Sequence, residues 1–358
     1  MKKSIININN VDYRKEPMFF SKCNLGLQRY DQPKYPQLFN MFKQQLSYFW
    51  RPEEINVSKD KADFNSLSEH ERFIFTTNLG YQIVLDSLQS RGISHLLTDC
   101  TNPEVEAFAK SWEFMETLHS YSYTYIIKQI YTNPTEVFDS FLENPEILKR
   151  TSSVTYYYDE LINQIPDDTE YNRKKKLYLT LVSINILEGI RFYVSFACSY
   201  CFAQNKKMEG NAKIISLINR DENLHMGFSS LILKMFGENA EEGFMDIVND
   251  CKDIVIKMYK DAAEEEIEWA KYLFKDGAMI GLNADILIQY MKWLTNNRMK
   301  MIKLEPAFDK IQNPISWISN WTESKSMQEA PQETEIISYT VGAFNQDTDK
   351  QDYSDFGI

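Results

Sequence analysis

Residues 102–130 read NPEVEAFAKSWEFMETLHSYSYTYIIKQI, and this stretch decides the fold class. Asn102 is a favourable N-cap residue, Pro103 suits the first helical position, and Glu104 lies near the positive end of the helix dipole. Apolar residues then recur with helical spacing as far as the Asn-Pro pair at 133–134. The stretch therefore predicts one helix of about 28 residues, roughly 42 Å long.

The same helical pattern extends over most of the chain. Ser66-Leu67-Ser68-Glu69 has the form of a capping box, and the helix it begins is expected to end near Ser90, before Gly92. No strand-like alternation longer than a few residues competes with the helical pattern. The chain is therefore expected to be all-α, with further helices over residues 35–49, 136–146, 151–164, 172–204, 208–236, 243–274 and 283–302.

Composition agrees with long helices and few tight turns. The 358 residues include 12 glycines and 11 prolines, which is fewer than the usual shares of about 7% and 5%. The net charge is −12, and no basic cluster is larger than residues 173–176. A free-standing nucleic-acid-binding protein needs a basic face, so this class is excluded.

Residues 177–203 form an apolar stretch that is long enough to span a bilayer. The stretch contains Glu188 and Arg191, and the mean hydropathy of the chain is −0.43. We therefore expect a buried core helix, with no membrane partner. The opening MKKSIININN has no apolar core or cleavage site of a secretory signal.

The five cysteines form an odd set without regular spacing, which favours a reduced, cytoplasmic location. Cys198 and Cys201 form a C-x-x-C pattern inside an apolar helix. Core packing is the favoured interpretation there, over redox or zinc chemistry.

The sequence suggests three parts: an N-terminal arm over 1–34, one helical domain over 35–321, and a flexible tail over 322–358. The tail is polar and acidic but carries scattered apolar and aromatic residues. These residues suggest that the tail docks on a partner, with a frayed end as the alternative.

Two of the four histidines follow a glutamate at the i, i+3 position, in Glu116-x-x-His119 and Glu222-x-x-His225. Side chains at this spacing on a helix project from one face, so each pair can bind a metal ion. Both pairs lie in long apolar helices. Charged residues are rare in such helices unless they are paired or bind a metal.

An acidic residue precedes each pair by the length of a helical hairpin. Asp86 precedes Glu116, and Glu188 precedes Glu222, each by roughly 30 residues, which is half a helix, a turn and half a helix back. This separation places each acid level with its pair, and two facing hairpins give a di-iron or di-manganese carboxylate site. The alternative is that Glu188 pairs with Arg191 and the histidines are ordinary core residues. The predicted ligands are Asp86, Glu116, His119, Glu188, Glu222 and His225.

Tyr123 lies one helical turn after His119 and two turns after Glu116, on the metal-facing side of the predicted helix. Tyr121 and Tyr125 are expected to face elsewhere. A phenol beside an oxidising metal suits a redox role, and three apolar residues at helical spacing from the ligands could exclude water from it: Phe192, Phe196 and Ile218.

With these residues identified, the chain resembles the small (β) subunit of class I ribonucleotide reductase, of the bacterial class Ia type, in the ferritin-like di-metal carboxylate superfamily. The resemblance covers most of the chain. It rests on ordered blocks: RKEPMFF (14–20), QLSYFWRPEE (45–54), ETLHSYSYT (116–124), LEGIRFYVSFA (187–197), GNAKII (210–215), RDENLH (220–225), NPISWI (313–318) and APQE (330–333).

The resemblance implies a ferritin-like bundle of long helices, with extra helices around a central four-helix metal site. It implies two iron ions per chain, oxo-bridged when oxidised, with manganese as the other candidate metal. Tyr123 would carry a stable radical, and the three apolar residues would protect it. Trp50 and Asp221, together with His119, would connect the metal site to the subunit surface.

The resemblance also implies a partner and a reaction. Tyr339 would relay the radical toward the large (α) subunit, Glu333 would assist, and the last residues would dock that subunit. The terminal SDFGI departs from the ending of the best-known members, so the partner should be cognate. The implied protein is a cytoplasmic homodimer that acts in ribonucleoside-diphosphate reduction only together with the large subunit.

Two other classes of function are alternatives, and the first of them would share the six predicted ligands. A di-metal monooxygenase or oxidase needs neither Tyr123 nor Tyr339, so the presence of both argues against it. A ferritin-like iron store would be shorter and would not surround a tyrosine with phenylalanines. A plain helical interaction protein is grouped with the iron store in the second of these classes, and size-exclusion behaviour separates a dimer from a storage cage.

Overall fold

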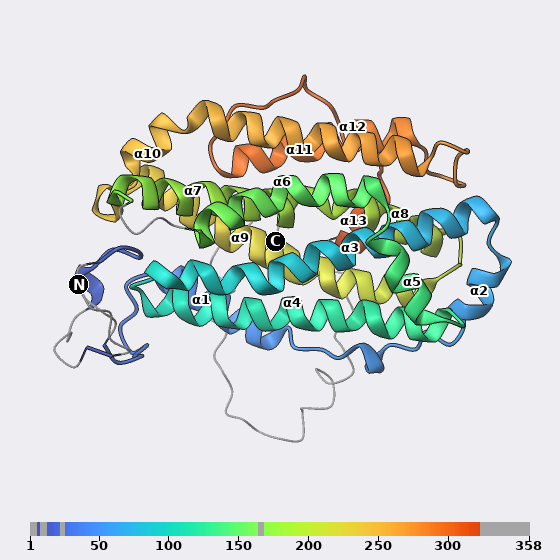
Figure 1. The fold of residues 1–358 in the computed structure, drawn as a ribbon, viewed down its shortest axis with the longest axis horizontal. Helices are drawn as coiled ribbons and strands as arrows, with labels where there is room; N and C mark the ends of the chain where they lie inside the picture. Colours follow the sequence, from blue (N-terminus) through green and yellow to red (C-terminus); the bar gives the residue numbers. More distant parts are fainter. Residues whose placement is uncertain (1–5, 8–12, 22–25, 164–167, 323–358) are drawn as a thin grey trace.

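The computed structural model describes residues 6–7, 13–21, 26–163 and 168–322, which fold into a bundle of long α-helices (Figure 1). The expected all-α class is confirmed, since β structure in the described residues is limited to two isolated bridges. The helical segments are η1 (Tyr13–Lys15), α1 (Pro36–Ser47), η2 (Pro52–Glu54), α2 (Asp60–Ser66), α3 (Glu69–Leu96), η3 (Leu97–Asp99), α4 (Pro103–Ile130), α5 (Pro134–Phe141), α6 (Pro145–Ile162), α7 (Glu170–Ile186), η4 (Leu187–Arg191), α8 (Tyr193–Gln204), α9 (Glu209–Glu238), η5 (Ala240–Glu242), α10 (Met245–Asp250), α11 (Lys252–Leu273), α12 (Ala284–Met301) and α13 (Ser319–Thr322).

Four helical segments build the centre of the bundle. Helix α3 packs against α4, the α7–α8 segment packs against α9, and α4 also contacts α9. In Figure 1, α11 and α12 lie along one long side, and α1 and α4 lie along the opposite side. The faces that α3, α4, η4 and α9 turn toward one another are therefore enclosed, and these elements carry the predicted metal ligands.

Helix α3 begins at a different capping box from the one predicted. Ser68 Oγ accepts a hydrogen bond from the Glu71 backbone N–H at 3.2 Å, and Glu71 Oε2 accepts one from the Ser68 N–H at 2.8 Å. The predicted box at 66–69 was wrong because Ser66 is the last residue of α2. The Glu71 side chain reaches back to the Ser68 backbone N–H and satisfies this donor, as a capping box requires.

Gly92 does not end α3, which continues to Leu96. Tyr158 of α6 packs over this position so closely that an added Cβ would overlap its ring. A glycine inside a helix costs about 1 kcal/mol relative to alanine, and here it admits a neighbouring helix. Gly92 therefore serves packing, and the predicted stop near residue 90 was wrong.

Replacing Gly92 with alanine is expected to lower the free energy of unfolding by about 1–3 kcal/mol, because the new methyl group meets a buried ring. Urea denaturation measures the change. Gly237→Ala in α9 is the matched control, since its Cβ would have its nearest neighbour at 3.6 Å. The control variant should leave the free energy of unfolding unchanged or raise it. Equal changes at both positions would contradict the packing role of Gly92.

Helices α5 and α6 both start earlier than the predicted 136–146 and 151–164. Each begins at an Asn-Pro pair, and Asn144 Oδ1 accepts a hydrogen bond from the Glu146 N–H at 2.9 Å. The same pattern marks the start of α4. An N-cap asparagine followed by proline was thus the correct start signal at all three positions.

The predicted helix over 172–204 is interrupted by η4, a five-residue π-helical segment between α7 and α8. Together these segments make Glu170–Gln204, the one described helix that is long and apolar enough to cross a membrane, and its apolar window is completely buried. The expected core helix is therefore observed. The prediction over 243–274 divides into α10 and α11 at Cys251, whereas 208–236 and 283–302 agree closely with α9 and α12.

Candidate metal centre

The structure brings all six predicted ligands together at the centre of the bundle. Asp86 comes from α3, Glu116 and His119 from α4, Glu188 from η4, and Glu222 and His225 from α9; each has no exposed surface. Their ligand atoms form two groups that could each hold a metal ion, with all atoms of a group within 4.8 Å of one another. The groups are Asp86, Glu116, His119 and Glu222, and Glu116, Glu188, Glu222 and His225.

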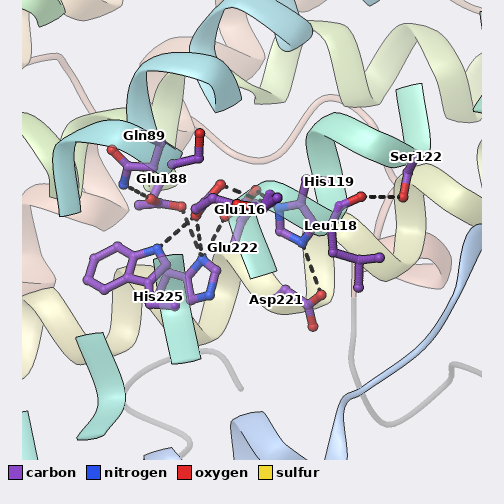
Figure 2. A network of polar contacts seen from close by, with 12 residues as sticks. Gln89, Glu116, Leu118, His119, Ser122, Glu188, Asp221, Glu222 and His225 are labelled. Carbon is purple, nitrogen blue, oxygen red and sulfur yellow. Dashed lines mark hydrogen bonds and ion pairs between the residues drawn. The ribbon is translucent and has the colours of Figure 1, made fainter. Parts of the chain in front are cut away.

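Glu116 and Glu222 belong to both groups, so they lie between two adjacent cation positions. His225 Nδ1 lies 2.9 Å from Glu222 Oε2 and 3.1 Å from Glu116 Oε1. His119 Nδ1 lies 3.1 Å from the other Glu222 oxygen, Oε1. Figure 2 shows both rings directed at the shared carboxylates. The arrangement could hold two cations, with Glu116 and Glu222 available to both.

The far side of each imidazole has its own partner. His119 Nε2 lies 3.1 Å from Asp221 Oδ2, and His225 Nε2 lies 2.8 Å from Gln45 Oε1. An acceptor at Nε2 keeps the proton there and leaves Nδ1 free to bind a metal. Both Nδ1 atoms face the shared carboxylates, so the rings are oriented as ligands.

Two carboxylates are also held by hydrogen bonds that the sequence did not reveal. Trp112 Nε1 donates to Glu116 Oε1 at 2.8 Å, and Gln89 Nε2 donates to Glu188 Oε1. Tyr158 in turn donates its hydroxyl to Gln89 Oε1. Trp112 lies one helical turn before Glu116, and Gln89 lies one turn after Asp86. Helical spacing could have placed both on the ligand face, but neither residue type has a strong metal-site signal.

The donor set fits two divalent ions of iron or manganese. Several buried atoms of the ligands form no well-directed hydrogen bond: both Asp86 carboxylate oxygens, Glu116 Oε2, His119 Nδ1, Glu188 Oε2 and Glu222 Oε1. Each such buried polar atom costs about 1–3 kcal/mol unless a partner is supplied. Two divalent cations would balance four carboxylates, and these hard oxygen and imidazole ligands suit iron and manganese.

Burial and mutual repulsion raise the pKa of three of the carboxyl groups. Burial, and then the charge of Glu116, raises the pKa of Asp86 well above its usual range and that of Glu222 to about 8. Burial, and then the charge of Glu222, raises the pKa of Glu188. Burial opposes the ionisation of Glu116 too, but its contacts with the two histidines hold its pKa at about 2.

The free energy of unfolding of the metal-free protein is expected to fall between about pH 6 and pH 8.5. The folded forms of Asp86, Glu188 and Glu222 hold protons that the unfolded acids release near pH 4, at a pKa of about 4.3 for glutamate. Their stabilising effect is therefore complete below pH 4 and is lost as the pH rises through the folded pKa, which is about 8 for Glu222.

Urea unfolding of the metal-free protein at several pH values measures this slope. A Co²⁺-loaded sample is the control, and its stability should rise with pH because metal binding displaces the protons. A metal-free protein that becomes more stable toward pH 8.5 would contradict the raised pKa values.

The alternative pairing of Glu188 with Arg191 is not observed. Arg191 Nη1 lies 2.8 Å from Glu265 Oε2 and 3.8 Å from Glu266 Oε1, on α11. Glu188 instead faces His225 Nδ1, at 3.6 Å. The arginine therefore does not neutralise the ligand group.

Tyr123 is completely buried on α4, and its hydroxyl faces the carboxyl group of Asp86. Burial, and then the charges of Asp86 and Glu222, raises the pKa of this phenol. Tyr121 and Tyr125 face elsewhere, as predicted, and their hydroxyls donate to Glu53 Oε1 and the Ile55 carbonyl. Three residues lie completely buried in the same apolar core as Tyr123: Phe192, Phe196 and Ile218.

Trp50 and Asp221 form a continuous connection with His119. Trp50 Nε1 donates to Asp221 Oδ2 at 2.9 Å, and the same oxygen lies 3.1 Å from His119 Nε2. All three side chains are buried. Tyr339 and Glu333 lie outside the described residues, as do the last residues that were predicted to dock the large subunit.

Comparison with known proteins identifies the family. Residues 28–337 match the family model described as "Ribonucleotide reductase, small chain". The chain belongs to the ribonucleotide reductase small-chain family. It is 45% identical over 369 residues to the ribonucleoside-diphosphate reductase subunit beta of Haemophilus influenzae, a match that covers 98% of each chain.

Solved structures of small-chain proteins share the fold. The ribonucleotide reductase R2 subunit from Clostridium botulinum superposes with a TM-score of 0.80 at 26% identity, covering 90% of this chain and 98% of that one. The dimanganese(II)-NrdF of Streptococcus sanguinis, at 21% identity, gives a TM-score of 0.67 and covers 84% of this chain and all of that one. The ferritin-like fold is therefore confirmed.

Membership of the ribonucleotide reductase small-chain family confirms the expected class of enzyme and excludes the storage, monooxygenase and plain interaction-protein interpretations.

The burial of the cysteines agrees with the structural role predicted for them. Cys100, Cys198, Cys201 and Cys251 are free thiols buried in the core. Cys198 and Cys201 thus pack inside α8, as expected.

Proposed function

We propose that this chain is the radical-generating subunit of a ribonucleoside-diphosphate reductase, and that Tyr123 is the residue that carries the radical. One observation supports this most strongly. The Tyr123 hydroxyl is completely buried, and the acid that faces it is Asp86, one of the six predicted ligands. This position puts the phenol next to the metal site, where a bound oxidant could reach it.

The six ligands would hold two iron ions, and manganese is the other metal that suits the same donor set. When bound, the iron pair together with dioxygen supplies the oxidising power needed to remove one electron from Tyr123. Because its pKa is raised by burial and by Asp86, the phenol stays protonated at neutral pH. Oxidation must therefore remove a proton together with the electron.

Three buried apolar residues of the core that also contains Tyr123 are proposed to shield its radical. Phe192 and Phe196 stack with their ring centroids 5.5 Å apart, and both are completely buried, as is Ile218. Apolar side chains offer no proton or electron to a phenoxyl and exclude water. These three residues are therefore proposed to protect the radical.

The connection from His119 through Asp221 to Trp50 is proposed to carry the radical away from the metal site. The two donor–acceptor distances, 3.1 and 2.9 Å, allow a proton to shift along the connection as an electron moves. The path would continue through Tyr339, with Glu333 assisting, to the large subunit docked by the last residues. The active assembly would be a cytoplasmic homodimer of this chain with its cognate large subunit.

The test is low-temperature electron paramagnetic resonance on metal-free protein that is loaded with ferrous iron and exposed to air. The parent should show an organic-radical signal, and Tyr123→Phe should show none while binding the same amount of iron. Absence of a radical in the parent, with two irons bound per chain, would reject iron-driven radical generation. Reconstitution with manganese and an external oxidant would then be the next experiment.

A further inference from the structure

Arg298 of α12 contacts two of the segments that carry metal ligands, although α12 itself supplies no ligand. Its Nε donates to the carbonyl oxygen of Gly189 at 3.2 Å, and Gly189 directly follows Glu188. Its Nη2 lies 3.4 Å from Asn223 Oδ1, and Asn223 directly follows Glu222. One guanidinium thus joins η4 to α9 at the positions next to two ligands.

Tyr193 completes this arrangement. Its hydroxyl accepts a hydrogen bond from Arg298 Nη2 at 2.9 Å and donates one to Asn223 Oδ1 at 2.8 Å. The guanidinium carbon also lies 5.2 Å from the centroid of the Tyr193 ring. The planar guanidinium can serve the carbonyl and the phenol at once because its donors point in fixed, different directions.

The segment that Arg298 holds has an unusual conformation. Residues Leu187–Arg191 form a π-helical turn, which is rare and is retained mostly at functional sites. The approach is close on both sides of Gly189, where an added Cβ would lie 3.1 Å from Met226 Cγ and 3.4 Å from Arg298 Cδ. The surroundings of η4 therefore fix its backbone, and Arg298 is the charged group that bonds the backbone at Gly189.

We propose that Arg298 is a positioning residue. It fixes Glu188 toward the metal position formed by Glu116, Glu188, Glu222 and His225. Glu188 belongs to one of the two ligand groups and not to the other. Loss of Arg298 should therefore weaken the ion held by Glu116, Glu188, Glu222 and His225 more than the ion beside Asp86. This inference rests on the proposed function, because it concerns the metal site named there.

Replacing Arg298 with a shorter side chain is not expected to leave an empty cavity in the core. It lines an open cavity of about 710 Å³ between α9 and α12, so water can occupy the space that a shorter side chain leaves. Lys300 lines the same cavity and contacts neither η4 nor Asn223 in any hydrogen bond of the described residues. Lys300→Met is therefore a matched control that removes one positive charge from the same cavity.

The experiment is a Co²⁺ titration of metal-free protein, followed by visible absorption and calorimetry. The parent and Lys300→Met should bind two ions per chain. Arg298→Met should bind one ion with the parent's affinity and the other about 10–100-fold more weakly, which is the usual effect of removing a group that orients a ligand. Arg298→Lys should fall between them, because an ammonium keeps the charge but lacks the rigid fork of donors that serves the carbonyl and the phenol at fixed directions.

Thermal unfolding of the metal-free variants shows whether each variant folds, and so separates a positioning role of Arg298 from a general effect on stability. If Arg298→Met binds both ions as the parent does, or weakens both equally, the proposal is overturned. If Arg298→Met does not fold, the same comparison applies to Arg298→Lys, and equal affinity for both ions there also overturns it. If the parent itself binds fewer than two ions, the proposed dinuclear centre fails instead.

Discussion

Replacing Glu222 with glutamine will leave the chain folded but unable to hold two divalent ions. Glu222 lies in both ligand groups, and its two oxygens face different histidines. Its loss should weaken binding of both ions by more than about 100-fold, beyond the range seen for groups that only orient ligands. A Co²⁺ titration measures the loss.

The stability of the metal-free form should change little in this variant. Burial, and then the charge of Glu116, raises the pKa of Glu222 to about 8, so near neutral pH the metal-free side chain is largely protonated. Glutamine is a neutral mimic of that acid, and the free energy of unfolding should shift by less than about 1 kcal/mol.

Glu266→Gln is the matched control for this experiment. Glu266 is also completely buried, its pKa is raised to about 7 by burial, and it accepts a hydrogen bond from Tyr81 at 2.6 Å. It lies outside both ligand groups, so its variant should bind two ions normally. Normal Co²⁺ binding by Glu222→Gln would show that the shared position is not needed.

Replacing the adjacent Asp221 with asparagine should give the opposite pattern. Asp221 Oδ2 is the oxygen that Trp50 and His119 share, so the amide removes the charge that links them. The six ligands remain, and we expect two bound ions and a radical on Tyr123. Turnover with the large subunit should fall by about 10²–10⁴-fold, the range typical for loss of a group that transfers a proton.

Two tryptophan variants test whether the path is specific. Trp50→Phe removes the donor to Asp221 and should reproduce the loss of turnover. Trp112→Phe removes the donor to Glu116, at 2.8 Å on the ligand itself, and should affect metal binding more than radical transfer. Full turnover by Asp221→Asn with a normal radical yield would exclude this path.

The helices that local signals define well were predictable. Helix α4 begins at the Asn102 cap and ends at Ile130, as its sequence indicates. The helix end predicted before Gly92 was wrong because this glycine makes room for the ring of Tyr158. Tyr158 belongs to a different helix, α6, far along the chain. The π-helical turn was not predictable, since the surrounding helix is apolar on all sides. One extra residue in such a helix produces no visible change in pattern.

In the candidate site, too, some residues were predictable from the sequence and others were not. The grouping of its six acids and histidines was predictable because helix geometry fixes which residues share a face and how far a hairpin partner lies along the chain. Gln45 of α1 contacts the ligand-group histidine His225, and Arg298 of α12 contacts Gly189, the residue next to Glu188. An uncharged amide or a single arginine in a helix has many ordinary roles, so only the tertiary structure assigns these two.

The buried helix over Glu170–Gln204 has a consequence for the synthesis of the chain. Its earlier partners, α3 and α6, are already made when it leaves the ribosome, but α9 and α11 are not, and α11 is complete only at Leu273. At about 5–20 residues per second, synthesis from Gln204 to Leu273 takes roughly 3–14 s. Part of an apolar segment with the length of a membrane span stays uncovered for that time. Slow translation beyond residue 204 would prolong the exposure of this apolar surface to aggregation.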